Sequence, residues 1–550
     1  MEESFLKENL FRYICVVVFC LATIFLFSYF NVAKTSLKDS KNANLVIYGD
    51  NISTAYTPFI QDDGIYISVD TISKVIDTHI YYDKQATKVI ITTEDTVLKF
   101  KIDENKAHRN FVEESISTPA RFINDMAYID INLVKDLYNI IVSYNEETST
   151  ISIDKTNDGN QVVKYNFTNV YEDLKTNSNV LKILNKGSKI TVYTESLKHN
   201  RWYKIKTEDG IIGYISKNSV DVSNNSSDKI SNSNNSENAE KINMFWQYGS
   251  ELSTLGDKIE GVNVVSPTWY ELKNAEGDIS SKASSKYLEK AKQNGYEVWP
   301  IITNGIDDVN YTAADTSAMV NSEYNREQFI KNLVEILKKD KVDGINIDFE
   351  AMRTEDRDVF TQFVRELAPI LRNAGLKVSA DIYFVAYVDR KGVGEAVDYV
   401  MLMGYDQRGN WSSVAGSISE ISWVEENIES LMNDSKIPAN KIILGIPFYT
   451  RLWTQKAGAT KPTTTVYTMA NCQTFLKNNN LQATLDEASG QNYAEYTKGN
   501  TTYKLWIEDA DSVKRRIETV NKYNLAGVCA WRKGLETQDI WKVINDTLKK

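Results

Sequence analysis

The stretch Asp343-Gly-Ile-Asn-Ile-Asp-Phe-Glu350 decides the fold of this chain. Its alternation predicts a β-strand with Asn346, Asp348 and Glu350 on one face and the isoleucines between them on the other. The apolar face can pack against helices, whereas the opposite face carries an amide and two carboxyls. Burying carboxylates costs several kcal/mol unless they are hydrogen-bonded or their pKa values shift. Acid–base chemistry is a frequent reason for such a cost, and a satisfied polar cluster at a strand end is the alternative.

Candidate strands and amphipathic helices alternate on both sides of this stretch, from residue 241 to residue 550. Eight strands with intervening helices predict an α/β fold, a (β/α)8 TIM barrel. Catalytic groups of that architecture lie at the carboxyl ends of strands, where Asp348 and Glu350 fall. A doubly wound sheet is the alternative, but no glycine-rich phosphate loop follows the first strand. The candidate strands are 242–247, 261–265, 297–302, 342–350, 376–382, 398–405, 441–448 and 525–531, and the clearest helices are 325–339 and 355–374.

The composition limits the chemistry. A chain of 550 residues, 42% hydrophobic and 25% charged, is expected to form several ordinary globular domains. A net charge of −11 disfavours a nucleic-acid partner, because no broad basic field is present. All three histidines precede residue 200, and the four cysteines form neither a disulfide framework nor a zinc-binding spacing. We therefore expect no metal or cofactor in the C-terminal half, and carboxylates remain to carry its chemistry.

Residues 1–34 are predicted to form a transmembrane anchor. No charged residue occurs from Tyr13 to Ala33, and Arg12 and Lys34 close this apolar run. The run is long enough to span a bilayer and longer than the usual core of a signal peptide. Because Asn31-Val-Ala33 is a poor cleavage site, an uncleaved single-pass anchor is favoured over a removed signal.

Residues 45–155 contain an internal repeat in which each copy is expected to form a strand, a short helix, a strand, a turn and a strand. The pattern resembles the copper amine oxidase N-terminal-like domain, a small α+β repeat module. Two scattered histidines cannot form a copper site, so a stalk or wall-binding module is expected. The matching pairs are Tyr66 and Tyr128, Ile67 and Ile129, Val69 and Ile131, Ile72 and Val134, Val75 and Leu137, Tyr82 and Tyr144, Val89 and Ile151, and Ile91 and Ile153.

Residues 161–221 resemble a bacterial SH3-like β-barrel. The resemblance rests on short strands between turns, above all Arg201-Trp-Tyr-Lys-Ile and Asp209-Gly-Ile-Ile-Gly-Tyr-Ile215. The family is associated with cell-wall or peptide binding, and a spacer without a ligand is the alternative. Residues 222–240, rich in Asn and Ser, are predicted to be a flexible linker because they cannot bury enough apolar surface to order themselves.

Four ordered motifs in residues 241–550 resemble glycoside hydrolase family 18. The first, Asp343 to Glu350, resembles the family's Asp-x-x-Asp-x-Asp-x-Glu signature. The segment Gly416-Ser-Ile-Ser-Glu-Ile-Ser-Trp-Val424 is similar to the branch of chitinase-like proteins that holds spore and cell-wall peptidoglycan N-acetylglucosaminidases. The other motifs are Met403-Gly-Tyr-Asp406, Gly445-Ile-Pro-Phe-Tyr-Thr-Arg-Leu-Trp453 and Gly527-Val-Cys-Ala-Trp531.

Asn346 departs from the pattern, because chitinases usually carry an aspartate at this position. In those enzymes that aspartate is a buried partner of the next one, which corresponds to Asp348 here. An amide can hydrogen-bond Asp348, but it cannot share a proton with it. The departure puts the pKa coupling in doubt and favours the peptidoglycan-active branch.

The resemblance implies that the substrate supplies the nucleophile, its 2-acetamido oxygen, while one acid protonates the leaving group. Glu350 is expected to be that acid, and Asp348 to orient the acetamido group and stabilise the oxazolinium. Tyr405 is expected to hydrogen-bond the acetamido oxygen. Asn346 supports Asp348, Asp406 shapes the same subsite and Trp531 forms the apolar floor under the sugar.

Two classes of function remain open: a retaining hydrolase of β-1,4-linked N-acetylglucosamine glycans and a lectin-like protein on an inactive barrel. The acidic and aromatic residues of the family are all present, which favours the enzyme. The anchor, repeat module and SH3-like module suggest a protein on the cell membrane with its barrel facing the wall, and a monomer is expected. Peptidoglycan is therefore favoured over chitin, and exo or endo cleavage and a sporulation role stay open.

Overall fold

The computed structural model describes the chain in five stretches, and these divide into two compact units. The described residues are 40–193, 201–221, 240–249, 253–305 and 313–548. One unit lies within 1–82, 100–107 and 114–227, and the other within 83–99, 108–113 and 228–550.

The anchor predicted for residues 1–34 lies outside the described residues, as does the predicted linker except for its last residue. Among the helices that are described, none is long and apolar enough to cross a membrane.

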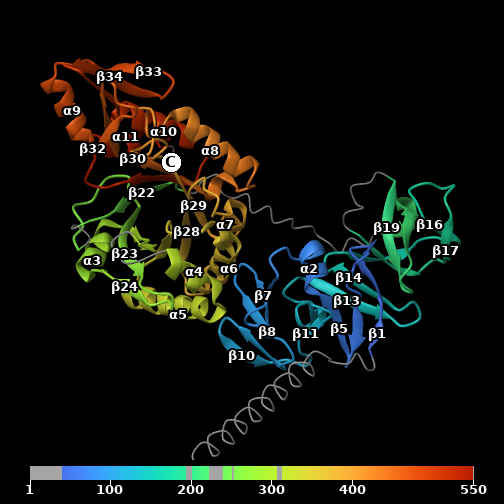
Figure 1. Cartoon of the computed structure of the whole chain (residues 1–550). Helices are drawn as coiled ribbons and strands as arrows, with labels where there is room; N and C mark the ends of the chain where they lie inside the picture. Colours follow the sequence, from blue (N-terminus) through green and yellow to red (C-terminus); the bar gives the residue numbers. More distant parts are fainter. Residues whose placement is uncertain (1–39, 194–200, 222–239, 250–252, 306–312, 549–550) are drawn as a thin grey trace, which may run out of the picture. The chain divides into compact units, whose positions relative to one another are not determined.

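The second unit contains the predicted (β/α)8 barrel. In its described part, eight parallel strands close into a cylinder because the last strand, β36, pairs with the first, β22. Figure 1 labels β22, β23, β28, β29 and β30 among them. These strands are buried along almost their whole length, as expected for parallel strands covered on both faces. In barrel order they are β22 (Ile242–Gln247), β23 (Val264–Leu272), β26 (Ile301–Thr303), β27 (Gly344–Asp348), β28 (Lys377–Ile382), β29 (Tyr399–Met403), β30 (Ile442–Pro447) and β36 (Gly527–Trp531).

The strand predicted at 261–265 begins later than expected. Gly261 has a φ of 81°, a conformation that glycine adopts readily and that belongs to a turn, so β23 begins at Val264. Two short strands, β24 (Ile279–Ser281) and β25 (Glu297–Val298), pair with β23.

The barrel helices follow the apolar periodicity of the sequence. In α5 and α6 the buried stripe faces the core, and Ser322 caps α5 by accepting a hydrogen bond from the backbone of Asn325. The helices are α3 (Ser285–Asn294), α4 (Ala313–Asn321), α5 (Glu323–Asp340), α6 (Arg357–Asn373), α7 (Arg390–Ala396), α8 (Ile421–Asn433), α10 (Ala510–Lys522) and α11 (Ile540–Thr547).

A small antiparallel sheet, which the sequence pattern did not predict, is inserted between β30 and α10. Its strand order is β32-β31-β35-β34-β33, and its core contains Leu452, Cys472 and Leu505. The elements are β31 (Tyr449–Lys456), β32 (Thr463–Thr468), α9 (Met469–Asn478), β33 (Thr484–Asp486), β34 (Gln491–Lys498) and β35 (Thr501–Ile507).

The first unit contains most of the repeat module. The two copies meet where β5 (Gly64–Ser68) pairs antiparallel with β12 (Met126–Asp130). A short helix follows each of these strands, α2 (Val69–Val75) in the first copy and a 3-10 turn (Ile131–Leu133) in the second. The other strands are β1 (Lys41–Asn42), β2 (Asn44–Ile47), β3 (Asp50–Asn51), β4 (Phe59–Gln61), β6 (Tyr81–Asp83), β9 (Lys106–Arg109), β10 (Val112–Ser115), β11 (Arg121–Ile123), β13 (Ile140–Asn145) and β14 (Thr150–Lys155).

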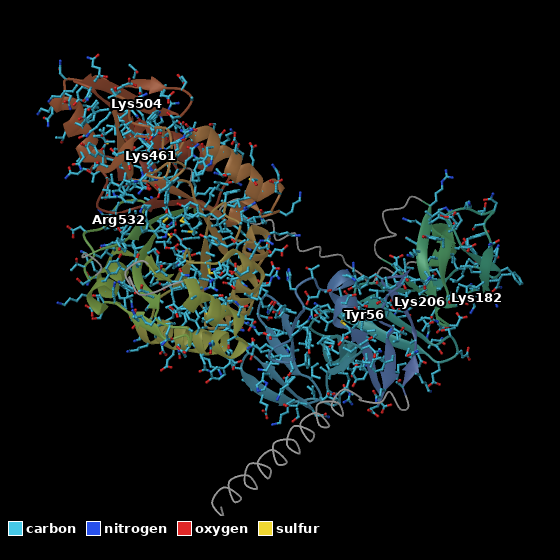
Figure 2. All side chains as sticks on the ribbon, viewed as in Figure 1. Tyr56, Lys182, Lys206, Lys461, Lys504 and Arg532 are labelled. Atoms are coloured by element: carbon cyan, nitrogen blue, oxygen red, sulfur yellow. The ribbon has the colours of Figure 1, made fainter. Side chains whose placement is uncertain are left out.

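The SH3-like β-barrel of the first unit encloses a core of Val, Leu and Ile side chains. Lys206 of β19 pairs with Asp154 of β14, which joins this barrel to the repeat module; Figure 2 labels Lys206. The strands are β15 (Gly159–Val163), β16 (Thr168–Tyr171), β17 (Val180–Leu184), β18 (Lys189–Val192), β19 (Trp202–Thr207), β20 (Ile212–Ser216) and β21 (Val220–Asp221).

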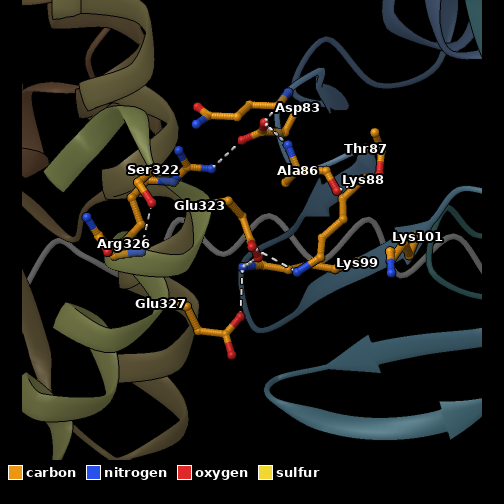
Figure 3. A network of polar contacts seen from close by, with 12 residues as sticks. Asp83, Ala86, Thr87, Lys88, Lys99, Lys101, Ser322, Glu323, Arg326 and Glu327 are labelled. Carbon is orange, nitrogen blue, oxygen red and sulfur yellow. Dashed lines mark hydrogen bonds and ion pairs between the residues drawn. The ribbon is translucent and has the colours of Figure 1, made fainter. Parts of the chain in front are cut away.

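One hairpin of the repeat module belongs to the compact unit of the TIM barrel. It comprises residues 83–99, with β7 (Lys88–Thr92) and the beginning of β8 (Val97–Lys101). A cluster of buried charges holds it against α5 and α6 (Figure 3). At the far end of α6, Arg372 and Asn373 donate hydrogen bonds to the backbone carbonyls of Glu94 and Asp95.

Lys99 is the centre of this charge cluster. Its ammonium lies 2.6 Å from Glu323, 3.2 Å from Glu327 and 3.1 Å from Glu366, and the Lys99 side chain is only 4% exposed. Arg326 of α5 forms a second pair, 3.0 Å from Asp83. Buried charges of this kind are tolerated only when paired, so the hairpin and the two helices depend on each other.

Candidate active site

The alternation of β27 places Asn346 and Asp348 inside the barrel, as the sequence predicted. Asn346 is fully buried and Asp348 is 4% exposed. Glu350 follows the end of the strand; the residue is exposed to solvent, although the surrounding protein partly desolvates its carboxyl. The two carboxyls therefore lie at the carboxyl-terminal edge of the barrel, where this architecture carries its chemistry.

A chain of hydrogen bonds crosses the barrel interior beneath these carboxyls. The indole Nε1 of Trp246, on β22, donates to Asn346 Oδ1 at 2.6 Å. Asn346 Nδ2 in turn donates to Asp381 Oδ1, on β28, at 2.7 Å. Both ends of the amide are thus used, which fixes its orientation and directs its donor to a carboxylate.

The carboxyls of the site have raised pKa values. Burial, then the charges of Asp381 and Glu350, raise the pKa of Asp348 well above its ordinary value. Burial also raises the pKa of Glu350, against a hydrogen bond from Asp348 that lowers it, and the charge of Asp406 raises it further. A carboxyl that keeps its proton at higher pH than usual is suited to act as a general acid.

The backbone that carries Glu350 is fixed by Asn304, which follows β26. Asn304 Oδ1 accepts hydrogen bonds from the backbone nitrogens of Glu350 and Ala351 at 3.0 and 3.1 Å. Its Nδ2 donates to the Ala351 carbonyl at 3.0 Å and to Thr316 at 2.9 Å. One buried amide therefore determines the path of the chain as it leaves β27.

Aromatic rings surround the carboxyls. Trp246 contacts Tyr405 edge-on with 6.3 Å between ring centroids and contacts Trp531 with 6.0 Å between centroids. Tyr405 is buried and also contacts Tyr449 at 6.4 Å, whereas Trp531 is partly exposed. The predicted residues Tyr405 and Trp531 thus come together around Trp246, at the ends of β29 and β36.

Asp406 connects the barrel to the inserted sheet. Its carboxylate lies 3.2 Å from Arg451 of β31, and it also accepts a hydrogen bond from Tyr449. The Arg451 guanidinium lies 5.8 Å from the ring of Trp411, which is 61% exposed. An exposed indole next to the site is a surface on which a sugar ring can stack.

The structure therefore brings together all six residues that the sequence singled out, namely Asn346, Asp348, Glu350, Tyr405, Asp406 and Trp531. Sequence reasoning missed several others in the same place. Tyr383 and Tyr387, after β28, interact with the charges of Asp348 and Glu350. The others are Trp246, Asn304, Asp381, Trp411 and Arg451. For Asn304 and Asp381 a signal was present, because each is a polar residue at the carboxyl end of a predicted strand. In the described stretches, no group of three or more His, Cys, Asp or Glu side chains is arranged to hold a metal ion.

The site is a pair of carboxyls with raised pKa values among aromatic rings, at the carboxyl-terminal edge of a closed (β/α)8 barrel. The family model of the glycosyl hydrolases family 18 matches residues 210–535, more than half of the chain. The chain belongs to this family and is a glycosidase. Two further models match it: the copper amine oxidase N-terminal domain over residues 46–153 and the bacterial SH3 domain over residues 166–221.

The relatives include spore enzymes and chitinases. An uncharacterized glycosylase of Bacillus subtilis, YvbX, is 27% identical over 285 residues, which cover 50% of this chain and 81% of YvbX. The cortical fragment-lytic enzyme of Bacillus subtilis is 26% identical over 243 residues, and the match covers 42% of this chain. That match spans only 55% of the cortical fragment-lytic enzyme.

Two solved structures support the fold. A chitinase from Chromobacterium violaceum superposes with a TM-score of 0.50 and 21% identity, over 56% of this chain and 99% of the chitinase. The spore cortex-lytic enzyme SleL of Bacillus megaterium superposes with a TM-score of 0.50 and 17% identity, over 68% of this chain and 80% of SleL.

Proposed function

We propose that this glycosidase is a retaining hydrolase that cleaves β-1,4-linked N-acetylglucosamine glycans, with peptidoglycan as the substrate class. The observation that carries the proposal is the Asp348–Glu350 pair at the carboxyl-terminal edge of the barrel, with raised pKa values and Tyr405 close by. In this family the substrate supplies its own nucleophile, so one proton donor and one orienting carboxylate suffice.

Glu350 protonates the oxygen of the leaving sugar, since its pKa is raised by burial and by Asp406. The acetamido oxygen of the substrate attacks the anomeric carbon from the opposite side, and an oxazolinium forms as the glycosidic bond breaks. Asp348 accepts a hydrogen bond from the acetamido N–H and stabilises the positive charge. Glu350, now ionised, then takes a proton from the water that opens the ring.

The aromatic residues hold the sugar. Tyr405 donates its hydroxyl to the acetamido oxygen, since burial keeps its pKa high and its proton in place. Trp531 offers its partly exposed ring as the floor of the subsite, and Asp406 shapes the same subsite while paired with Arg451. Trp411 gives a second aromatic surface for the glycan beyond the cleaved bond.

The substrate proposal rests on the relatives and on the modules. Relatives from three Bacillus species are named cortical fragment-lytic enzymes, and others are named chitinases. The repeat and SH3 modules together with the apolar run from Tyr13 to Ala33 favour an enzyme held at the cell membrane by one span, with its barrel facing the wall. We propose that the protein acts as a monomer, and chitin is the competing substrate.

The test is a pair of single substitutions assayed on two polymers. Glu350→Gln keeps the size of the side chain but cannot deliver a proton, so turnover is expected to fall by about 10²- to 10⁴-fold while glycan binding persists. Glu355→Gln is the control, because this exposed carboxyl lies a few residues further along the chain. Purified peptidoglycan and chitin are digested side by side, and the new reducing ends are identified by mass spectrometry. Undiminished turnover by the Glu350→Gln protein would refute the mechanism, and faster release from chitin would refute the choice of substrate.

A further inference from the structure

A third carboxyl, Asp381, lies beside the catalytic pair on the neighbouring strand. The parallel register of β27 and β28 pairs Asn346 with Ser379 and Ile347 with Ala380. The next step of that register sets Asp348 beside Asp381, and both side chains face the barrel interior. The electrostatics agree, because the charge of Asp381 is the largest cause after burial of the raised pKa of Asp348.

Asp381 is held in place from below by an amide. The bond from Asn346 Nδ2 at 2.7 Å occupies Asp381 Oδ1, and Trp246 fixes Asn346 through its other end. The amide therefore acts as a rigid donor to Asp381. This use explains why position 346 carries no carboxyl: an aspartate there would face Asp381 with a like charge.

Asp348 has an oxygen that lacks a partner within the described site. Asp348 Oδ1 is buried, and no hydrogen bond to it is formed by any described residue. A buried, unpaired carboxylate oxygen is costly, so the atom either carries a proton or awaits a donor. Asp348 is buried and Asp381 is partly buried, at matching positions of adjacent strands, so both cannot be charged without a large cost. One proton shared between them removes that cost.

The other groups around Asp381 do not neutralise it. The tyrosine and cysteine side chains have pKa values raised by burial and keep their protons, and Arg451 is paired with Asp406. The ionisable groups facing Asp381 or its carboxyl neighbours are Asp348 and Glu350 of β27, Tyr383 and Tyr387 after β28, Tyr405 and Asp406 after β29, Tyr449 of β31 and Cys529 of β36.

We propose that Asp381 is a positioning residue that exchanges one proton with Asp348. In the free enzyme the proton is held by Asp348; when substrate binds, it passes from Asp348 Oδ to Asp381 Oδ. Asp348 is then an anion that can accept the acetamido N–H, and Asp381 is neutral. No bond other than these two O–H bonds changes in this step, and the inference rests on the proposed function of Asp348.

The test is a set of variants that moves one carboxyl between two strands. Asp381→Asn removes a negative charge from the cluster, so its remaining carboxyls ionise at lower pH, and both limbs of the kcat/KM profile are expected to move to lower pH. Asn346→Asp adds a charge, and both limbs are expected to move to higher pH. The double variant Asn346→Asp/Asp381→Asn returns the charge count to that of the wild type and is expected to bring the profile back toward it.

Activity at the wild-type optimum is expected to fall by about tenfold for each pH unit that the basic limb of the Asp381→Asn profile moves. Ser379→Ala is the matched control, because Ser379 is a buried polar residue two positions earlier on β28 whose hydroxyl donates to the Ile345 carbonyl. Its profile is expected to overlay that of the wild type. An Asp381→Asn profile that also overlays it, in a protein with an unchanged circular dichroism spectrum, overturns the inference.

A second measurement does not depend on turnover. In full-length protein labelled with ¹³C at the aspartate carboxyls, the Asp348 resonance is expected to titrate at lower pH in Asp381→Asn than in the wild type. An unchanged titration overturns the inference even if the enzyme is inactive on every glycan tested. Should Asp381→Asn not fold, the double variant decides: a profile identical to that of Asn346→Asp alone overturns the inference, and a shift back toward wild type supports it.

Discussion

Replacing Lys99 by methionine tests whether the hairpin of residues 83–99 is a structural part of the TIM barrel. Methionine keeps the length of the side chain and removes its charge. The change leaves Glu323, Glu327 and Glu366 close together on α5 and α6 without the cation that now lies within 3.2 Å of each of them. We expect the compact unit of the barrel to lose stability, although residue 99 is far from the catalytic edge in sequence.

The magnitude can be worked from Glu323, whose side chain is 6% exposed. Burial alone would raise its pKa, but the charge of Lys99 and hydrogen bonds from Lys88 and Lys99 lower it from 4.5 to about 2. A shift of this size corresponds to about 3 kcal/mol at neutral pH. Lys88 contributes part of this stabilisation of Glu323, but Lys99 also pairs with Glu366. A loss of about 3 kcal/mol therefore agrees with the usual cost of breaking a buried pair, about 3–5 kcal/mol.

The same pKa fixes the pH dependence. Because the folded-state pKa of Glu323 is depressed, its ion pair contributes stability that is fully present above the pKa of the unfolded carboxyl, about 4.3. This contribution is lost as pH falls from about 4.3 toward 2, where Glu323 takes up a proton in the folded state. The difference in stability between wild type and Lys99→Met is thus expected to be large at pH 7 and to shrink in acid.

The assay is thermal unfolding of the full-length chain at several pH values, with limited proteolysis to identify which unit opens first. Lys101→Met is the control, because Lys101 pairs with Glu104 and the two side chains are 48% and 44% exposed. An exposed pair contributes about 1 kcal/mol at most, so this variant is expected to unfold close to the wild type. Equal unfolding temperatures for Lys99→Met and Lys101→Met at pH 7 would refute the reasoning.

Three further predictions concern the barrel. A protein of residues 241–550 lacks Lys88 and Lys99, and its thermal unfolding is expected at a lower temperature than that of the barrel unit in the full chain; an equal temperature would show that the hairpin adds nothing. Trp411→Ala is expected to raise KM for long glycans about fivefold, equivalent to about 1 kcal/mol of aromatic contact, with kcat unchanged; a loss of kcat alone would contradict this. Asn304→Ala releases the backbone of Glu350, so kcat is expected to fall about tenfold or more with little change in KM, in steady-state assays on a soluble oligosaccharide.

The barrel and its catalytic strand could be predicted because their signals are local. Apolar strands and amphipathic helices have periods that are visible in short windows, and the alternation around Asp348 shows which side chains face inward. The motifs at the ends of β27, β29 and β36 predicted that Glu350, Tyr405 and Trp531 lie at one edge of the barrel, because the carboxyl ends of parallel strands meet there. Each of these predictions uses only the sequence of a single strand and the residues at its ends.

The inserted sheet between β30 and α10 had weaker signals. Its strands are rich in Thr and Tyr, and most of their residues are partly buried or exposed, without a continuous buried run. A pattern search for barrel strands passes over such segments because each is apolar on at most one face. The sheet nevertheless supplies Tyr449 and Arg451 to the site. Because the sequence pattern did not predict the sheet, it did not predict these two partners of Asp406 either.

Two features depend on pairing between distant residues and could not be derived from local pattern. Lys99 reads as a polar residue inside a strand of the repeat module, and only the fold shows that three glutamates from barrel helices surround it. In the sequence, Asn346 looks like the absence of a carboxyl from β27. Only the register of β27 with β28 shows that the carboxyl of Asp381 lies next to Asn346. A substitution at one strand therefore cannot be judged from that strand alone. In the proposed proton exchange, the second acidic group beside Asp348 comes from the neighbouring strand β28 as Asp381, and Asn346 of β27 donates a hydrogen bond to it.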